Sequence, residues 1–234
     1  MIRFIASLPN AIIPSAMQPM EHSGNDNGKD RFILVSSDIH DAEYAFEKLA
    51  QKANAQNCAA FLYAGDLNVE NYFICNTLKY RSFTFLPVLG NCDNPWAWTD
   101  AGVPQPPQFR TLTYANRTGE LRIYMSHGHL YPYPSSVGLG DEDFELCITG
   151  HTHINSLKTD VPETSSNSGK QLVMLNPGSP SCPRGGSPQS YAVIRIPDEG
   201  SDVGSAVVEI RDFVCDDLLS EMAVPLHKVE ERND

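Results

Sequence analysis

Five short motifs combine carboxylate, amide and imidazole side chains, the groups that bind divalent transition metals in proteins. The motifs are Asp38-Ile39-His40, Gly65-Asp66, Gly90-Asn91-Cys92-Asp93, His127-Gly128-His129 and Gly150-His151-Thr152-His153. Of the seven histidines in the chain, five lie in these motifs, and only His22 and His227 lie elsewhere. This concentration predicts a metal site.

Taken singly, each motif has a simpler interpretation. Asp38 could cap a following helix, and Gly65-Asp66 is a common turn dipeptide. Asn91 and Asp93 could be turn residues before a proline. The two His-x-His pairs would each point to one face if the backbone there is extended. These simpler explanations would have to apply independently to five consecutive motifs, so the joint occurrence of the motifs favours the metal site.

A predicted strand precedes each motif. The strands are short apolar runs at residues 32–37, 59–64, 83–89, 121–126 and 145–149. The spacing of apolar residues predicts an amphipathic helix over 41–56 and a weaker one over 71–80. Ligands collect outside the carboxyl ends of strands in open α/β sheets, so we expect the five motifs to meet at one edge.

The order of elements predicts the fold class. Two successive strand–helix–strand units imply a parallel sheet core. Residues 110–115 and 121–126 flank the turn-rich segment 116–119, which predicts a hairpin. Further strands are expected at 171–175, 191–196 and 206–214, and we expect this second half to be largely antiparallel. The prediction is an α/β sandwich of two mixed β-sheets flanked by helices.

We expect one domain, at residues 31–215, within the 234-residue chain. Residues 1–30 are predicted to be an N-terminal extension that prolines interrupt too often for a secretory signal, and 216–234 an acidic C-terminal tail. Residues 161–170 are predicted to be a flexible connection. Six cysteines without a C-x-x-C pair favour reduced thiols and a cytoplasmic protein, and no apolar run is long enough to span a membrane.

The charge balance excludes one class of partner. The chain has 17 Lys and Arg against 29 Asp and Glu, a net charge of −12. Proteins that hold an extended nucleic acid depend on basic residues at its phosphates, so no extended nucleic-acid surface is expected. If the protein binds phosphate, metal ions are the expected source of positive charge.

The ordered motifs resemble those of the calcineurin-like metallophosphoesterases. Gly-Asn-Cys-Asp, His-Gly-His-Leu and the later Asn176-Pro-Gly-Ser179 resemble in particular the small bacterial phosphodiesterases of the YfcE type. The similarity covers about residues 31–196. It implies hydrolysis of a small phosphodiester by a metal-bound hydroxide. A non-catalytic scaffold of the same fold, a phosphomonoesterase and a nuclease are the alternatives.

The resemblance also implies a ligand set for two divalent metal ions. The first ion would be held by Asp38, His40 and His153. The second would be held by Asn91, His127 and His151, and Asp66 would bridge the two. Mixed nitrogen and oxygen ligation favours Mn²⁺, with Fe, Zn or Ni as alternatives. All seven ligand positions are filled, which favours an active enzyme over a scaffold.

Three residues near these ligands have open roles. Cys92 stands where many family members have a histidine that assists the leaving group, and a thiol supplies no positive charge. It is interpreted as a small buried residue beside the site. His129 is either a substitute proton donor or a hydrogen-bonding partner of a ligand, and Arg184 is either part of a turn or a phosphate contact. Without a positioned acid, activated phosphodiesters are the expected substrates.

The remaining signal is a group of aromatic residues near the motifs. Its members are Trp96, Trp98, Phe109, Tyr131 and Tyr133. They are expected to pack in the core, to line a substrate cleft or to form a contact in a homo-oligomer.

Overall fold

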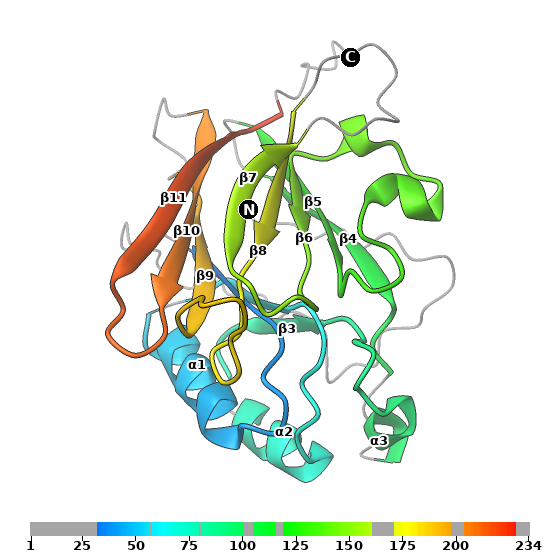
Figure 1. Ribbon diagram of the computed structural model, residues 1–234, viewed down its shortest axis with the longest axis vertical. Coiled ribbons are helices and arrows are strands. Elements are labelled where there is room, and N and C mark those ends of the chain that lie inside the picture. The colour runs from blue at the N-terminus through cyan, green and yellow to red at the C-terminus, as the bar shows by residue number, and fades with distance from the viewer. Residues whose placement is uncertain are drawn as a thin grey trace.

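The computed structural model describes residues 32–56, 58–79, 81–100, 105–115, 119–160, 171–197 and 204–227. The predicted N-terminal extension at 1–30, the connection at 161–170 and most of the turn at 116–119 lie outside these ranges. The described residues form two β-sheets with helices beside them (Figure 1). None of their helices is long and apolar enough to cross a membrane.

The first sheet, called sheet A, has six strands in the order β11-β10-β9-β1-β2-β3. Their bounds are β1 Phe32–Ser36, β2 Ala60–Tyr63, β3 Thr84–Pro87, β9 Ser190–Arg195, β10 Ser205–Asp212 and β11 Leu218–Pro225. The strands β1, β2 and β3 are parallel, as the strand–helix–strand pattern predicts. The strands β9, β10 and β11 are antiparallel to their neighbours.

The second sheet, called sheet B, has five strands in the order β4-β5-β6-β8-β7. Their bounds are β4 Phe109–Ala115, β5 Glu120–Ser126, β6 Leu146–Ile148, β7 Ser156–Asp160 and β8 Leu172–Asn176. The hairpin β4–β5 is confirmed. The expectation of a largely antiparallel second half is wrong for the centre of sheet B, because β5, β6 and β8 run parallel.

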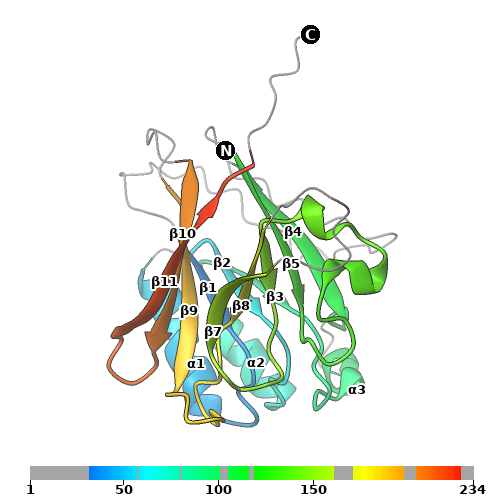
Figure 2. The same ribbon diagram turned by 45° about the horizontal axis from the view of Figure 1, so that its top comes forward.

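The helices are few and short. They are α1 Glu43–Ala55, α2 Asn71–Leu78, α3 Pro95–Asp100 and the 3₁₀ helices η2 Pro134–Val137 and η3 Asp141–Asp143. Figures 1 and 2 show α1 and α2 together beside sheet A, and α3 apart from them. Alternation along β1 explains this arrangement: Ile33 and Val35 pack between the two sheets, whereas Phe32 and Leu34 pack with the buried face of α1.

The C-terminal segment departs from the prediction of an acidic surface tail at 216–234. Residues 218–225 of it form β11, the edge strand of sheet A, paired with β10 along its length. Most of its side chains are exposed, so the sequence has no apolar alternation there. Backbone hydrogen bonds to β10 hold this strand, and its composition does not reveal them.

Candidate metal centre

The five motifs meet at one edge of the molecule because the strands before them run the same way. Asp38 follows β1, Asp66 follows β2 and Asn91 follows β3, all in sheet A. His127 follows β5 and His151 follows β6 in sheet B. The carboxyl ends of the parallel strands of both sheets therefore converge, as the sequence predicts.

Six of the seven predicted ligands lie within contact distance of another ligand through their polar atoms. His127 Nε2 is 3.1 Å from Asn91 Oδ1 and 3.3 Å from Asp66 Oδ2. His40 Nε2 is 3.6 Å from the same oxygen of Asp66. His153 Nε2 is 3.4 Å from Asp38 Oδ1 and 3.1 Å from His40 Nε2. Asp66 thus lies between the two groups of ligands, where a bridging carboxylate would be needed.

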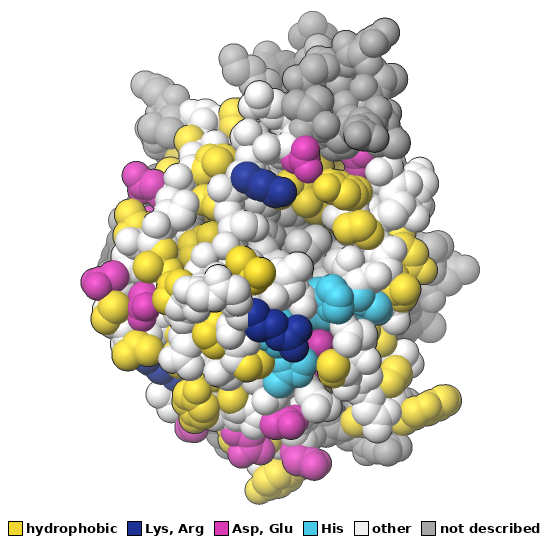
Figure 3. Space-filling view, viewed as in Figure 1, with side chains coloured by type: hydrophobic (Ala, Val, Ile, Leu, Met, Phe, Trp, Pro, Cys, Tyr) yellow, Lys and Arg dark blue, Asp and Glu magenta, His cyan; other side chains and the backbone are white. Residues whose placement is uncertain are grey.

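The seventh predicted ligand, His151, joins the cluster through its ring. Its centroid is 5.2 Å from that of His127, and its backbone N–H donates to Asp38 Oδ2 at 2.9 Å. Figure 3 shows histidine side chains gathered in one part of the surface, next to a basic and an acidic side chain. A metal ion bound here would be reached from solvent on this face.

The backbone of the ligand loops differs from the expected extended conformation. His151 and His153 have φ angles of 69° and 59°, in the left-handed region, so they do not alternate along a strand. Asp38, His40 and Asp66 also have positive φ, at 55°, 42° and 58°. Positive φ angles are energetically unfavourable for residues other than glycine, and residues that adopt them are often found at functional sites. The alternative that Asp38 caps a helix is excluded, because α1 has Ala42 at its N-cap and no side-chain cap.

The tautomers of two histidines follow from the contacts of their Nδ1 atoms. His127 Nδ1 is 2.7 Å from the Ala64 carbonyl oxygen, and His153 Nδ1 is 2.7 Å from that of Cys182. A carbonyl only accepts, so each Nδ1 carries the donated proton and each neutral ring presents the lone pair of Nε2. Those lone pairs face oxygen atoms of Asp38, Asp66 and Asn91. Acceptors that face acceptors need a cation or a proton between them.

The two carboxylates are not paired with lysine or arginine in the described part of the chain. Asp38 Oδ1 is buried and has no hydrogen-bond partner there. Among the described residues, the ion-pair partners of Asp38 and Asp66 are histidines, and none is a lysine or arginine. Buried carboxylates without such partners are found where a metal binds. The donor set therefore fits divalent ions that accept nitrogen and oxygen ligands.

Proton affinities reflect the same arrangement. Burial raises the pKa of Asp38 to about 6, although the nearby His127 opposes this. Burial also acts to raise the pKa of Asp66, but hydrogen bonding and charge from His127 and the Cys92 N–H outweigh it and lower that pKa below its usual range. The pKa of His127 is raised by the two carboxylates, against its burial. The proton affinity of His127 is thus increased at the position where a metal ion would bind.

Two glycines let the ligands approach one another. A Cβ added to Gly90 would lie 2.0 Å from Asp66 Oδ1, and one added to Gly65 would lie 2.7 Å from His127 Nδ1. Gly65 also has a φ of 93°. Any side chain at position 90 would displace the carboxylate between the two ligand groups.

Cys92 and His129 lie beside the ligands. The interpretation of Cys92 as a buried residue is wrong, because its side chain is exposed at the site. Desolvation and the charge of Asp66 raise the pKa of its thiol to about 11, so it is neutral near pH 7. His129 has a ring centroid 5.3 Å from that of His127, and its buried Nδ1 has no hydrogen-bond partner within the described ranges. Burial and the neighbouring histidines lower the pKa of His129.

The end of β8 and the loop that follows it donate hydrogen bonds to the backbone of two ligand loops. Asn176 Nδ2 donates to the Gly150 carbonyl at 2.8 Å, Ser179 Oγ to the Asp38 carbonyl at 2.7 Å and Ser181 Oγ to the Ile39 carbonyl at 2.6 Å. The sequence indicated the turn but not these contacts. Arg184 lies exposed beside the site, and its backbone N–H donates to the His153 carbonyl at 3.0 Å. Burial lowers the pKa of His153, and the charge of Arg184 lowers it further.

The aromatic residues do not form one cluster. Trp98 is buried in the core beside α1 and α2, whereas Trp96 is 75% exposed. Phe109 stacks on Tyr124 and contacts the edge of Tyr131.

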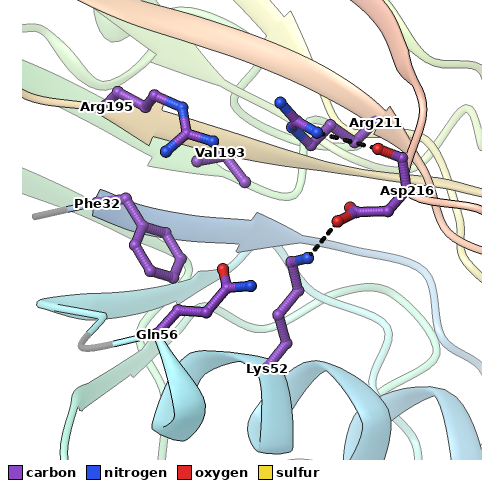
Figure 4. Close-up of a pocket in the computed structure, with 7 residues that line it drawn as sticks. All are labelled: Phe32, Lys52, Gln56, Val193, Arg195, Arg211 and Asp216. Carbon is purple, nitrogen blue, oxygen red and sulfur yellow. Dashed lines mark hydrogen bonds and ion pairs between the residues drawn. The ribbon is translucent and has the colours of Figure 1, made fainter. Parts of the chain in front are cut away.

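A second cluster of charged side chains lies beside β1, β9 and β10, on the face of sheet A that packs against α1. It surrounds a hollow of about 70 Å³ lined by Phe32, Lys52, Gln56, Val193, Arg195, Arg211 and Asp216 (Figure 4). Here acids and bases are paired. Lys52 Nζ is 2.7 Å from Asp216, and Glu209 accepts from Arg195 at 2.7 Å and from Arg211 at 2.6 Å. This cluster has no predicted metal ligands.

The chain belongs to the calcineurin-like phosphoesterase superfamily: the model of that superfamily domain matches residues 32–199. The chain is also a distant homologue of the protein named Phosphodiesterase YfcE from Escherichia coli (strain K12). It is 25% identical to that protein over 173 residues, which cover 69% of this chain and 86% of the relative.

Solved structures share the fold. The Escherichia coli Yfce phosphoesterase aligns with a TM-score of 0.63 and 18% identity, covering 82% of this chain and 99% of that one. A predicted phosphoesterase from Streptococcus pneumoniae TIGR4 aligns with a TM-score of 0.55 and 21% identity, covering 82% and 97%. Vacuolar Protein Sorting 29 from Cryptosporidium parvum aligns with a TM-score of 0.51 and 18% identity, covering 86% and 100%. The predicted two-sheet metallophosphoesterase fold is thus confirmed.

Proposed function

We propose that the protein is a metal-dependent phosphodiesterase that hydrolyses small phosphodiesters at a dinuclear centre. The observation that carries the proposal is the buried Asp38 Oδ1, which has no hydrogen-bond partner among the described residues and faces the lone pair of His153 Nε2 at 3.4 Å. A cation between them would satisfy both atoms. Membership of the phosphoesterase superfamily and the homology to a named phosphodiesterase support the reaction class.

The ligands divide into two groups around Asp66. Asp38, His40 and His153 would hold one ion, and Asn91, His127 and His151 the other. Two divalent ions so placed would activate a water molecule and bind the oxygens of a phosphate undergoing in-line displacement. We favour Mn²⁺, with Fe, Zn or Ni as alternatives, because imidazole and carboxylate ligands suit these ions.

The surroundings of the ligands favour particular substrates. The neutral thiol of Cys92 occupies the position of a possible leaving-group acid and supplies no charge. Substrates whose leaving group needs little protonation, such as aryl phosphodiesters, should therefore react best. His129 is a candidate hydrogen-bond donor to the leaving group, and exposed Arg184 a candidate contact for the phosphate. The net charge of −12 favours small substrates over extended nucleic acid.

The test compares substrates and variants of the whole chain in Mn²⁺. Wild type should hydrolyse bis-p-nitrophenyl phosphate faster than the corresponding phosphomonoester or single-stranded DNA. Asp66→Asn and His151→Ala should reduce that rate at least 100-fold, because each removes a ligand, and should leave the circular dichroism spectrum unchanged. Wild-type-like rates in either variant would contradict the ligand assignment. A preference for the monoester or for DNA would change the substrate class, and no turnover with any substrate would favour a non-catalytic scaffold.

A further inference from the structure

Asp93, the last residue of the motif after β3, makes an unusual set of hydrogen bonds. Its Oδ2 accepts from the backbone N–H of Asp66 at 2.9 Å and of Gly90 at 2.8 Å. Its Oδ1 accepts from the N–H of Leu67 at 2.9 Å and of Asn68 at 3.1 Å. One carboxylate thus joins the loop after β2 to the loop after β3, which lie about 25 residues apart in the sequence.

The loop after β2 needs such an acceptor. Asp66 and Asn68 have φ angles of 58° and 50°, and Gly65 has 93°. Successive N–H groups in this conformation converge and form a cradle for an anion. The side chain of Asp93 fills that cradle. The carbonyl groups of the same loop accept from the loop after β1, since His40 N–H donates to Asp66 and Asp41 N–H to Leu67.

The contact between the two loops is reciprocal. Asp93 accepts the N–H of Asp66, and Asp66 Oδ1 accepts the N–H of Cys92 at 2.7 Å. Asp66 is therefore held at its backbone by one loop residue and at its carboxylate by another, which leaves Oδ2 facing His127 and His40. Asn91 lies between Gly90 and Cys92, whose N–H groups are both bound in this network. Asp93 thus fixes two predicted ligands without contacting the site for the ions.

The first group of ligands has further contacts of its own. The loop after β1 is bound by Ser179 and Ser181 as well as by the loop after β2, and His153 is bound by the Cys182 carbonyl. The contacts of Ser179, Ser181 and Cys182 do not depend on Asp93. Loss of the Asp93 carboxylate should therefore act most strongly on Asp66 and Asn91 and less on Asp38, His40 and His153.

We propose that Asp93 is a positioning residue for the second metal ion: by binding four backbone N–H groups, it orients Asp66 and Asn91 so that the dinuclear centre can form. The inference rests on the proposed function, because it takes Asp66 as the bridge and Asn91 as a ligand. Outer partners of metal ligands contribute about 10- to 100-fold to metal affinity. The expected result of removing the carboxylate is therefore a protein that binds one ion well and the second poorly.

The test measures Mn²⁺ binding to the whole chain by equilibrium dialysis and electron paramagnetic resonance. Wild type should bind two ions per chain and give the spectrum of an exchange-coupled pair. Asp93→Asn should bind the first ion with an affinity within about threefold of wild type, bind the second about 10- to 100-fold more weakly, and give the spectrum of isolated Mn²⁺ at one equivalent. Asp93→Glu, which restores a carboxylate, should recover part of the second affinity.

Asp212→Asn is the matched control. Asp212 Oδ1 also accepts two backbone N–H groups, from Val214 at 2.7 Å and Cys215 at 3.0 Å, but it follows β10 and lies outside the ligand loops. This variant should bind both ions as wild type does. If Asp93→Asn does not fold, Asp93→Glu is compared with wild type in its place and should still show a weakened second site.

Two failures can be told apart. A wild-type chain that does not bind a pair of ions contradicts the proposed function. A wild-type chain that binds two ions, together with an Asp93→Asn chain that binds both equally well and keeps the coupled spectrum, contradicts only the role of Asp93. Equal weakening of both ions in Asp93→Asn would also overturn the inference, because the effect would then be general.

Discussion

The charged cluster beside β9 and β10 and the cluster at the strand ends differ in how their acids are balanced. In the first, Glu209 accepts from two arginines and Asp216 pairs with Lys52. In the second, Asp38 and Asp66 face histidines, and Asp38 Oδ1 has no hydrogen-bond partner among the described residues. The acids of the first cluster are paired with lysine and arginine side chains, whereas the described ion-pair partners of Asp38 and Asp66 are histidines.

This difference separates a structural network from a candidate site. Acids that are paired with lysine or arginine do not require a bound metal ion, and partly exposed pairs contribute modestly to stability. Buried carboxylates without a paired cation destabilise the fold unless a cation binds. The left-handed backbone of the ligand loops adds to this cost. The carboxyl end of the sheets thus has the features of a site built for a ligand.

The largest predicted change in the free energy of unfolding comes from neutralising one acid in each cluster. In the metal-free protein at pH 8, Asp38→Asn should raise the free energy of unfolding by roughly 3 kcal/mol, because the raised pKa of Asp38 reports an unfavourable buried charge. Glu209→Gln should lower that free energy by about 1–2 kcal/mol, because it weakens two charged hydrogen bonds. Urea unfolding measures both. Destabilisation in both variants would contradict the contrast between the clusters.

The same contrast has a pH signature. The pKa of Asp38 in the folded protein, about 6, lies above its unfolded value of 3.8. Its stabilising contribution is therefore complete below pH 3.8 and is lost as the pH rises through 6. Asp66 has the opposite sign: its pKa is lowered, so its contribution is present above 3.8 and is lost at lower pH. His127, whose pKa is raised, acts in the same sense as Asp38.

In the metal-free protein, the stability of Asp38→Asn relative to wild type should therefore increase from pH 4.5 to 7. Added Mn²⁺ should stabilise wild type more at pH 7 than at pH 4.5, because ionised Asp38 is the form that binds a cation. Thermal midpoints of both proteins, with and without Mn²⁺ at several pH values, measure this. A difference between the two metal-free midpoints that does not change over this pH range would contradict the assignment.

The smallest effect is expected from Lys52→Met. The Lys52–Asp216 pair is half-exposed, so its loss should change the free energy of unfolding by less than about 1 kcal/mol. Turnover and Mn²⁺ binding should be unchanged, because the side chains that hydrogen-bond to Asp216 in the described part of the chain are those of Lys52, Tyr191 and Arg211, and none is a predicted ligand. A loss of metal binding in this variant would show that the two clusters are coupled.

Much of the site could be predicted from the sequence because its ligands follow strands with clear apolar runs. The signal at Asp38, Asp66, Asn91 and the two His-x-His pairs is local, and parallel strands bring local signals to one edge. The structure brings all of these residues together.

The remaining features depend on contacts that no local pattern reveals. The sequence around Asp93 is compatible with a turn residue, yet its hydrogen-bond partners include the backbone N–H of Asp66, 27 positions earlier. The strands β7 and β11 have mostly exposed or half-exposed side chains, so they lack the alternation that predicts a strand. His151 and His153 adopt a left-handed backbone that their residue type does not require. In each case tertiary contacts determine a conformation that the sequence alone leaves open.

The central claim is that two metal ions bind around Asp66. The most direct measurement is anomalous X-ray diffraction from crystals of the whole chain soaked in Mn²⁺, with data collected on both sides of the manganese absorption edge. The account predicts two anomalous peaks about 3.5–4 Å apart, one beside Asp38, His40 and His153 and the other beside Asn91, His127 and His151, with Asp66 between them. No peak at the strand ends, or a single peak away from Asp66, would contradict it.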